Sequence, residues 1–186
     1  MASLDVPSAP TLSSGTRGVG LPSGDSPMDL RKRFAQYADD FDKTVDDDDW
    51  SRIRNHFTGD AIREEHVLPL IDLRHDGIDE IISQWRIMVE NFDRRFDRRI
   101  LVRTGPIEQN GNVVTLPWVG IYLFKGTPAL LGEGKEIARY ADDRIKHLET
   151  TWTADTVHRM IDWGAKYGSR VPGLLEYTTT LSSTRA

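Results

Sequence analysis

Residues 134–152 have the sequence GKEIARYADDRIKHLETTW, which contains two strand-like segments joined by a very short turn. The segments 134–140 and 144–152 flank Ala141-Asp142-Asp143, and so short a connection predicts a tight antiparallel hairpin. Alternate side chains of a strand point to opposite faces. If Glu136 faces the interior, Ala138 and Tyr140 therefore face it too.

A second hairpin signal lies upstream, at Gln109-Asn110-Gly111. Asn-Gly is strongly favoured in two-residue hairpin turns, because both residues tolerate positive φ. Strand-like segments flank it at 100–108 and 112–124. With residues 134–152, these segments predict an antiparallel meander of about four strands.

Helical patterns come mainly before the strands. In the first helix, apolar residues recur at three- and four-residue spacing, at Leu30, Phe34, Tyr37, Phe41 and Val45. The remaining predicted elements are a short helix carrying Trp50, Ile53 and Phe57, a short strand at 61–66, a helix over 78–92 and a last helix over 154–167 that begins after Thr153. This order predicts an α+β fold in which helices pack on one face of a curved antiparallel sheet and enclose an apolar pocket.

Composition limits the possible classes of protein. The 186 residues carry a net charge of −5 and include no cysteine, which excludes disulfides and thiol nucleophiles. The negative charge argues against nucleic-acid binding. The basic run at 94–99, interrupted by Asp97, is predicted to be a solvated helix-to-strand connection or an anion-tethering edge. No apolar stretch reaches the roughly 20 residues of a membrane helix, and no signal-peptide pattern is present. We therefore expect a soluble cytoplasmic protein without a membrane partner.

The chain divides by composition into one domain and two tails. Residues 1–27 are rich in Pro, Ser and Gly and are predicted to form a disordered N-terminal tail. Residues 28–168 form the predicted domain, and residues 169–186 are predicted to form a C-terminal tail. The five histidines lack metal-ligand spacing, and no redox or phosphate-binding motif is present, so neither a metal nor a cofactor is expected.

Two segments carry a family resemblance. They are YADDFDKTVDDDDWSRIRNHFTGDA at 37–61 and EIARYADDRIKHLETTW at 136–152. Both resemble the nuclear transport factor 2-like superfamily, and within it the SnoaL-like polyketide cyclases and the ketosteroid isomerases. The resemblance covers about residues 28–165 and implies a cystatin-like cone fold and a homodimer formed through the sheets. Because this fold hosts isomerases, cyclases, dehydratases, epoxide hydrolases and non-enzymes, individual residues must decide the chemistry.

The ketosteroid isomerase pattern implies two pocket carboxyls. The resemblance places the general base at Glu65 and a second carboxyl, which donates a hydrogen bond to the enolate, at Glu136. The oxyanion tyrosine of that family falls at Phe41, where its hydroxyl is missing, and Tyr37, one turn earlier on the same face, is a candidate substitute. We expect the rest of the substrate-binding wall, in which a glycine leaves room for a flat ligand, to consist of Leu116, Trp118, Gly120, Tyr122 and Tyr140.

Simpler explanations stay open for these residues. Glu65 is also explained as a surface carboxylate paired with Arg63 or Arg74. Glu136 is also explained by a structural role, and Tyr37 by packing between helix and sheet. Each explanation depends on which way the side chain points.

Other branches of the superfamily match less well. Scytalone-dehydratase-like enzymes carry a histidine where Trp118 stands. Limonene-epoxide-hydrolase-like enzymes use an Arg-x-Asp pair that the strand at 113–124 lacks, which leaves Glu149 as the single match. His66 is a neighbour of Glu65 in a strand, so the two cannot line the same cavity.

The residues and the resemblance together predict a cofactor-independent enzyme. It would act by acid–base catalysis, through isomerisation, cyclisation or dehydration via an enolate-like intermediate. The expected substrate is a hydrophobic small molecule of polyketide or terpenoid type, from secondary metabolism. The alternative is a non-catalytic small-molecule-binding or dimerisation module of the same fold.

Overall fold

The computed structural model describes residues 29–67 and 71–174, and the side chain of Ile71 is not part of the description. The helices are α1 (Leu30–Asp47), α2 (Ser51–Arg54), α3 (Ile78–Asn91) and α4 (Ala154–Tyr167), with short 3-10 turns η1 (Asp93–Arg95) and η2 (Gly168–Arg170). The strands are β1 (Phe57–Val67), β2 (Ile71–Asp76), β3 (Arg98–Arg103), β4 (Glu108–Asn110), β5 (Val113–Leu123), β6 (Leu130–Ala141) and β7 (Arg144–Trp152).

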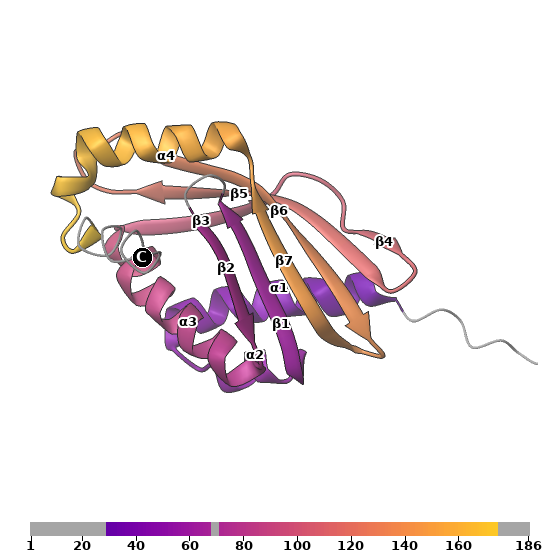
Figure 1. The fold of residues 1–186 in the computed structure, drawn as a ribbon. Helices are drawn as coiled ribbons and strands as arrows, with labels where there is room; N and C mark the ends of the chain where they lie inside the picture. Colours follow the sequence, from indigo (N-terminus) through magenta and orange to yellow (C-terminus); the bar gives the residue numbers. More distant parts are fainter. Residues whose placement is uncertain (1–28, 68–70, 175–186) are drawn as a thin grey trace, which may run out of the picture.

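The strands form one curved, open sheet in the order β2-β1-β7-β6-β5-β3, and β4 pairs with β5 (Figure 1). Helices α1 and α3 lie against one side of it, and α4 runs beside β6. The α+β fold with helices on one face of a curved sheet is thus confirmed. One pair departs from the antiparallel expectation, because β1 and β7 run parallel.

The two predicted hairpins are present. Asp142, with φ of 53°, makes the tight turn between β6 and β7, and Gly111, with φ of 59°, makes the turn between β4 and β5. Such positive φ values suit glycine and are tolerated by aspartate. The last helix begins as predicted, since the Thr153 hydroxyl accepts a hydrogen bond from the amide of Thr156 at 3.2 Å.

Three predicted segments differ from the structure. Phe57, expected to end the second helix, opens β1, because the sheet begins where the carbonyl of His56 accepts from the amide of Ile145 at 2.8 Å. The segment expected as one strand at 100–108 is split into β3 and β4, which pair with different parts of β5. The segment after β1, where no strand was predicted, contains β2. Its charged sequence IDLRHD is typical of a solvent-facing edge strand as well as of a loop.

The main core lies between the sheet and helices α1 and α3. At its centre the ring of Tyr37 meets the rings of Phe34 and Phe57, each with centroids 5.4 Å away. Such tilted and edge-to-face contacts are the favoured geometries of aromatic pairs. The apolar stripe predicted for the first helix is therefore what anchors it to the sheet.

A second, smaller apolar cluster joins α4 to the other end of the sheet. It contains Phe96, Tyr122, Leu130, Trp163, Val171 and Leu174. Val171 and Leu174 are buried although the sequence assigned them to the C-terminal tail, so packing continues beyond residue 168. Residues 1–28 and 175–186, which include the predicted N-terminal tail, lie outside the described residues.

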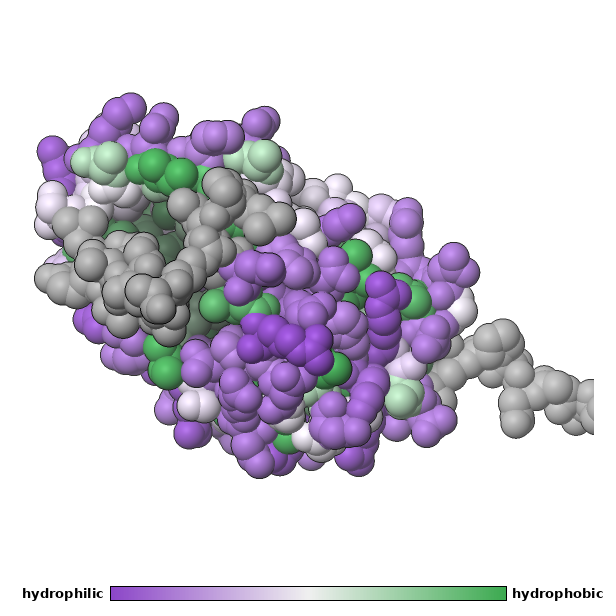
Figure 2. Space-filling model, viewed as in Figure 1, coloured by the Kyte–Doolittle hydropathy of each residue, from purple (hydrophilic) through white to green (hydrophobic). Residues whose placement is uncertain are grey.

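Much of the surface in Figure 2 is hydrophilic. On β1, β2 and β7, ion pairs join Glu64 to Arg74 and to His147 and join His66 to Asp72. Apolar patches also occur, and Ile161 on α4 is 45% exposed. Within the described residues, no helix is long and apolar enough to cross a membrane.

Candidate functional site

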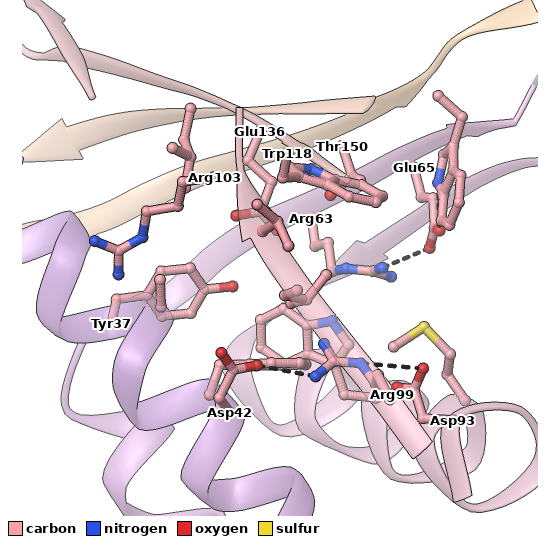
Figure 3. A pocket seen from close by; sticks show the side chains of 18 of the residues that line it. Tyr37, Asp42, Arg63, Glu65, Asp93, Arg99, Arg103, Trp118, Glu136 and Thr150 are labelled. Atoms are coloured by element: carbon pink, nitrogen blue, oxygen red, sulfur yellow. Dashed lines mark hydrogen bonds and ion pairs between the residues drawn. The ribbon is translucent and has the colours of Figure 1, made fainter. Parts of the chain in front are cut away.

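A cavity of about 130 Å³ opens between α1, α3 and the inner face of the sheet (Figure 3). It is lined by apolar and aromatic side chains with several charged groups among them. The lining residues used below are Tyr37, Phe41, Asp42, Arg63, Glu65, Trp85, Asp93, Arg99, Leu116, Trp118, Tyr122, Glu136, Thr150 and Trp152. An apolar pocket with a few converging polar groups is the usual form of a small-molecule site.

Both predicted carboxyls lie in one row across the sheet. The register pairs Glu65 with Thr150, Thr150 with Glu136, and Glu136 with Leu116, so one residue each of β1, β7, β6 and β5 lines up. Adjacent strands lie about 4.8 Å apart, which puts the two glutamate backbones roughly 10 Å from each other. Thr150, buried between them, forms the part of the cavity wall that separates the two acids.

Glu65 is held on both sides of its carboxylate. Nη2 of Arg63 donates to Oε2 at 2.5 Å, and Nε1 of Trp152 donates to Oε1 at 3.1 Å. Glu65 and Arg63 are 8% and 4% exposed, so this is a buried ion pair and not a surface contact. The guanidinium of Arg63 also lies over the Trp85 ring, 5.3 Å from its centroid. These contacts fix the position of Glu65.

Glu136 has the opposite environment. Among residues 29–67 and 71–174, none makes a hydrogen bond or ion pair with its carboxyl group. Burial raises its pKa to about 7; the positive charge of Arg63 opposes this shift, and the negative charge of Glu65 adds to it. A carboxyl whose pKa lies near neutrality can give or take a proton at physiological pH.

Tyr37 points its hydroxyl into the same part of the cavity (Figure 3). Burial raises the pKa of this hydroxyl well above its ordinary value, and the charge of Glu136 raises it further. The group therefore stays protonated at neutral pH and can donate a hydrogen bond. Phe41, one turn later, supplies an apolar wall and meets the Trp85 ring edge-on at 5.2 Å.

A second charged group lies farther along the pocket. Nε of Arg99 is 3.3 Å from Oδ1 of Asp93, and its Nη1 donates to Asp42 at 2.9 Å. Burial raises the pKa of Asp93, although Arg99 opposes the shift. Burial also raises the pKa of the Tyr122 hydroxyl, and the neighbouring Asp93 adds to it. The basic run at 94–99 thus supplies Arg99 to the pocket wall.

Two glycines of β6 make room for the tryptophans of the pocket. The rings of Trp118 and Trp152 meet edge-to-face at 4.9 Å. A Cβ on Gly132 would lie 2.5 Å from Cζ3 of Trp152, and a Cβ on Gly134 would lie 2.9 Å from Cζ2 of Trp118. Both distances are shorter than real Cβ contacts. The glycines therefore allow the ring placement that brings Nε1 of Trp152 to Glu65.

Most of the predicted site residues lie together in the cavity. They are Glu65, Glu136, Tyr37, Phe41, Leu116, Trp118 and Tyr122. Gly120 and Tyr140 are not among its lining residues. A Cβ on Gly120 would meet the Tyr122 ring at 3.1 Å, so the space expected for a flat ligand is filled by that ring. Tyr140 is buried in the main core, where its hydroxyl has no hydrogen-bond partner among the described residues.

Several pocket residues were not predicted from the sequence. They are Arg63, Asp93, Arg99, Thr150 and Trp152. Strand alternation could have predicted Arg63, because it lies two residues before Glu65 and must share its face. Alternation likewise places Thr150 and Trp152 together, while Glu149 is outside the lining set and contacts Thr151. The geometry thus gives no support to a role for Glu149 in epoxide hydrolysis.

The histidines lie outside the pocket. His66 faces away from Glu65, as alternation predicts, and its Nδ1 lies 2.7 Å from Asp72. His56 contacts Asp40 at 3.0 Å beside α1. Within the described parts of the chain, no three His, Asp or Glu side chains converge as the ligands of a metal ion would.

Comparison with known proteins supports the fold. No protein-family model matches the sequence, and no curated protein matches it. An NTF2-like protein of unknown function from Burkholderia pseudomallei has a TM-score of 0.57 and 12% identity, and the match covers 73% of this chain and 98% of that one. A protein of unknown function with a cystatin-like fold from Methylobium petroleophilum has a TM-score of 0.51 and 14% identity, with 69% and 78% covered.

A third solved structure with this fold has a name that suggests an activity. AclR from Streptomyces galilaeus, a proposed hydroxylase, has a TM-score of 0.52 and 12% identity, and the match covers 75% of this chain and 87% of that one. At such identities the likeness shows the fold and not the chemistry. The chain has a nuclear transport factor 2-like fold, and the SnoaL-like branch remains an inference from its residues.

Proposed function

We propose that the protein is a cofactor-independent enzyme that moves a proton on a small hydrophobic molecule by acid–base catalysis. The observation that carries this proposal is Glu136, an unpartnered carboxyl inside an apolar cavity with a pKa raised to about 7. Glu136 is half-buried, and an unpartnered carboxyl is costly to remove from water and is often found where a proton must be transferred. Isomerisation, cyclisation and dehydration through an enolate-like intermediate all use this step.

The contacts favour an exchange of the roles that the sequence assigned to the two glutamates. Each oxygen of Glu65 already accepts a hydrogen bond, from Arg63 or from Trp152, so this carboxylate is held by the protein and is not left free to move towards a substrate. Glu136 has no such partner among the described residues and is the better proton acceptor. Tyr37, whose hydroxyl stays protonated, is available to donate to an oxygen of the bound molecule.

The cavity size supports a substrate smaller than a polycyclic polyketide. Its volume of about 130 Å³ is close to the ~150 Å³ of an engineered protein cavity that binds benzene. A compound of about one ring fills it, whereas drug-sized ligands occupy pockets of roughly 300–1,000 Å³. We therefore propose a one-ring or short-chain substrate of terpenoid or polyketide type.

Deuterium uptake tests the proposal directly. The full chain is incubated in heavy water with one-ring ketones, enones and β-keto esters, and each compound is weighed by mass spectrometry. We expect uptake with at least one compound, its loss in Glu136→Gln, and its retention in an Arg74→Met/Glu64→Gln variant, which removes an ion pair between β1 and β2 on their outer face. Uptake that persists in Glu136→Gln would overturn the assignment.

The second candidate function is non-catalytic binding of a small molecule. It is favoured by the contacts of Glu65, which leave one of the two expected catalytic carboxyls engaged by the protein itself. Binding of one-ring compounds without deuterium uptake would support it over the enzyme.

We also propose a homodimer formed through the outer face of the sheet. Leu131 is 38% exposed, and the register pairs it with Ile121 of β5, which shares its face with Val119, so the three contribute to one outward surface. Sedimentation of the full chain tests this. We expect a dimer that Leu131→Lys converts to a monomer, and a monomeric wild type would contradict it.

A further inference from the structure

The guanidinium of Arg63 is buried in the pocket with most of its hydrogen-bonding capacity unused. Its side chain is 5% exposed, and the hydrogen bond from Nη2 to Glu65 is its one contact of that kind within the described residues. Nε is enclosed without an acceptor. Arginine has five N–H donors, and burying a donor without an acceptor is unfavourable. An acceptor on a ligand would use the donors that face the cavity.

Arg63 also lies between the two acids. Figure 3 shows its side chain reaching into the cavity, with Glu65 on one side and Glu136 and Tyr37 on the other. Among the charged groups, Arg63 has the largest effect on the pKa of Glu136, and it opposes the increase caused by burial. A molecule that gives a proton to Glu136 therefore has the free edge of this guanidinium beside it.

We propose that Arg63 is a further catalytic residue, whose free N–H groups hold the carbonyl oxygen of a one-ring or short-chain enolisable carbonyl compound. This inference rests on the proposed function, because it names the substrate class for the same pocket. The carbonyl oxygen accepts from Arg63 while the carbon next to it faces Glu136. Hydrogen-bond donors fixed where negative charge develops are a large source of rate acceleration.

The charge balance favours a neutral carbonyl compound over a carboxylate. Glu65 already compensates the charge of Arg63 at 2.5 Å. A permanent anion would add negative charge beside Glu65 and ionised Glu136, where like charges repel each other. A carbonyl becomes negative as Glu136 accepts a proton, so the total charge of the pocket stays the same throughout the step.

The proton transfer balances without a further reactant. The C–H bond next to the carbonyl breaks, and its proton moves to a carboxylate oxygen of Glu136. The electron pair of that bond forms a carbon–carbon double bond, and the carbonyl π pair moves to the oxygen that Arg63 holds. Return of the proton from Glu136 to a different carbon of a conjugated compound gives the isomer.

Binding of 4-nitrophenol tests this role without any catalysis. The compound has one ring, and its phenolate form, an enolate mimic, is coloured differently from the neutral form. The experiment uses the full chain with Glu136→Gln, which removes proton transfer and the charge at that position. Because Arg63 favours the anion, we expect the pKa of the bound phenol to fall by about 1 unit or more.

Variants at Arg63 have a matched control, an ion pair that joins β1 to β2. Arg63→Met/Glu65→Gln removes the buried ion pair without leaving either charge alone, and we expect phenolate affinity to fall about 10- to 100-fold. The control, Arg74→Met/Glu64→Gln, removes a pair of the same residue types from the outer faces of β1 and β2 and should keep the affinity of the Glu136→Gln chain. Equal phenolate affinity in the two double variants would overturn the proposal.

A measurement that leaves Arg63 and Glu65 in place covers the case in which the double variant does not fold. In the ¹⁵N-labelled Glu136→Gln chain, the Nε–H resonance of Arg63 should shift when 4-nitrophenol binds. An unchanged resonance, a phenol that binds in its neutral form, or no binding at all would each overturn the role of Arg63. Phenolate binding at Arg63 without deuterium uptake in the wild type would instead reject the proposed function and leave an oxyanion-binding pocket.

Discussion

Two walls of the pocket each contain a glutamate, and the two glutamates differ in their hydrogen-bond partners. On the β1–β7 wall, Glu65 is fixed by Arg63 and Trp152. On the wall formed by β6 and α1, Glu136 and the Tyr37 hydroxyl have no hydrogen-bond partners among the described residues. A partnered buried carboxylate stabilises its surroundings by position and charge, whereas an unpartnered one keeps a proton that it can exchange. The first wall therefore holds the shape of the site, and the second carries the groups that are available for reaction.

The largest expected effect is on activity, at Glu136. Glu136→Gln should lower the rate of deuterium exchange by about 10²- to 10⁴-fold, the usual contribution of a general acid or base. Thermal unfolding of the same variant should show no loss of stability, because no hydrogen bond of the described residues is removed. If the variant lost stability but kept its exchange rate, Glu136 would be a structural residue and not the reactive one.

Glu65→Gln should instead act on stability. The change leaves the buried Arg63 without its negative partner, and breaking a buried ion pair on one side costs about 3–5 kcal/mol in the free energy of unfolding. Urea unfolding measures this loss. Arg63→Met/Glu65→Gln should recover much of it, because neither charge is then left alone. A single variant as stable as the wild type would show that the pair is not buried in solution.

The pH dependence of stability should come from Glu136. Its pKa is about 7 in the folded chain against a model value of 4.5, so the unfolded chain loses this proton first. The resulting contribution to stability is complete below pH 4.5 and is lost as pH rises through 7, a change of ~3 kcal/mol at 1.36 kcal/mol per pKa unit. Urea unfolding at a series of pH values should show it.

Two variants serve as controls for that pH dependence. Glu136→Gln should remove this part of the pH dependence. Glu65→Gln should move it to lower pH, because the charge of Glu65 raises the pKa of Glu136. The same pH profile in wild type and Glu136→Gln would assign the effect to another group.

The smallest expected effect belongs to the Tyr37 hydroxyl. Tyr37→Phe removes one donor from the reactive wall and should slow exchange about 5-fold, equivalent to one hydrogen bond of ~1 kcal/mol. The aromatic contacts of the ring remain, so thermal unfolding should hardly change. Phe34→Tyr, at a fully buried ring of the same helix, is a control for added polarity in the core. A large stability loss in Tyr37→Phe would identify the hydroxyl as structural.

Local sequence patterns were sufficient for much of the fold. Asn110-Gly111 and Ala141-Asp142-Asp143 specify hairpin turns through the few residue types that tolerate positive φ. The apolar stripe of α1 specifies a helix with one buried face. Elements held by contacts distant in sequence were less accessible. The edge strand β2 has a charged sequence that predicts a loop until its pairing with β1 is known.

The sequence by itself determined that Glu65 and Glu136 lie on strands and that Phe41 lacks the hydroxyl expected there. It also determined which strand neighbours share a face, because the period of a strand is two. The tertiary structure alone decided that Thr150 separates the two acids, that Trp152 and Arg63 engage Glu65, and that Glu136 is left without a partner. A carboxyl's reactivity depends on burial and neighbouring charges, which are set by strands distant in sequence.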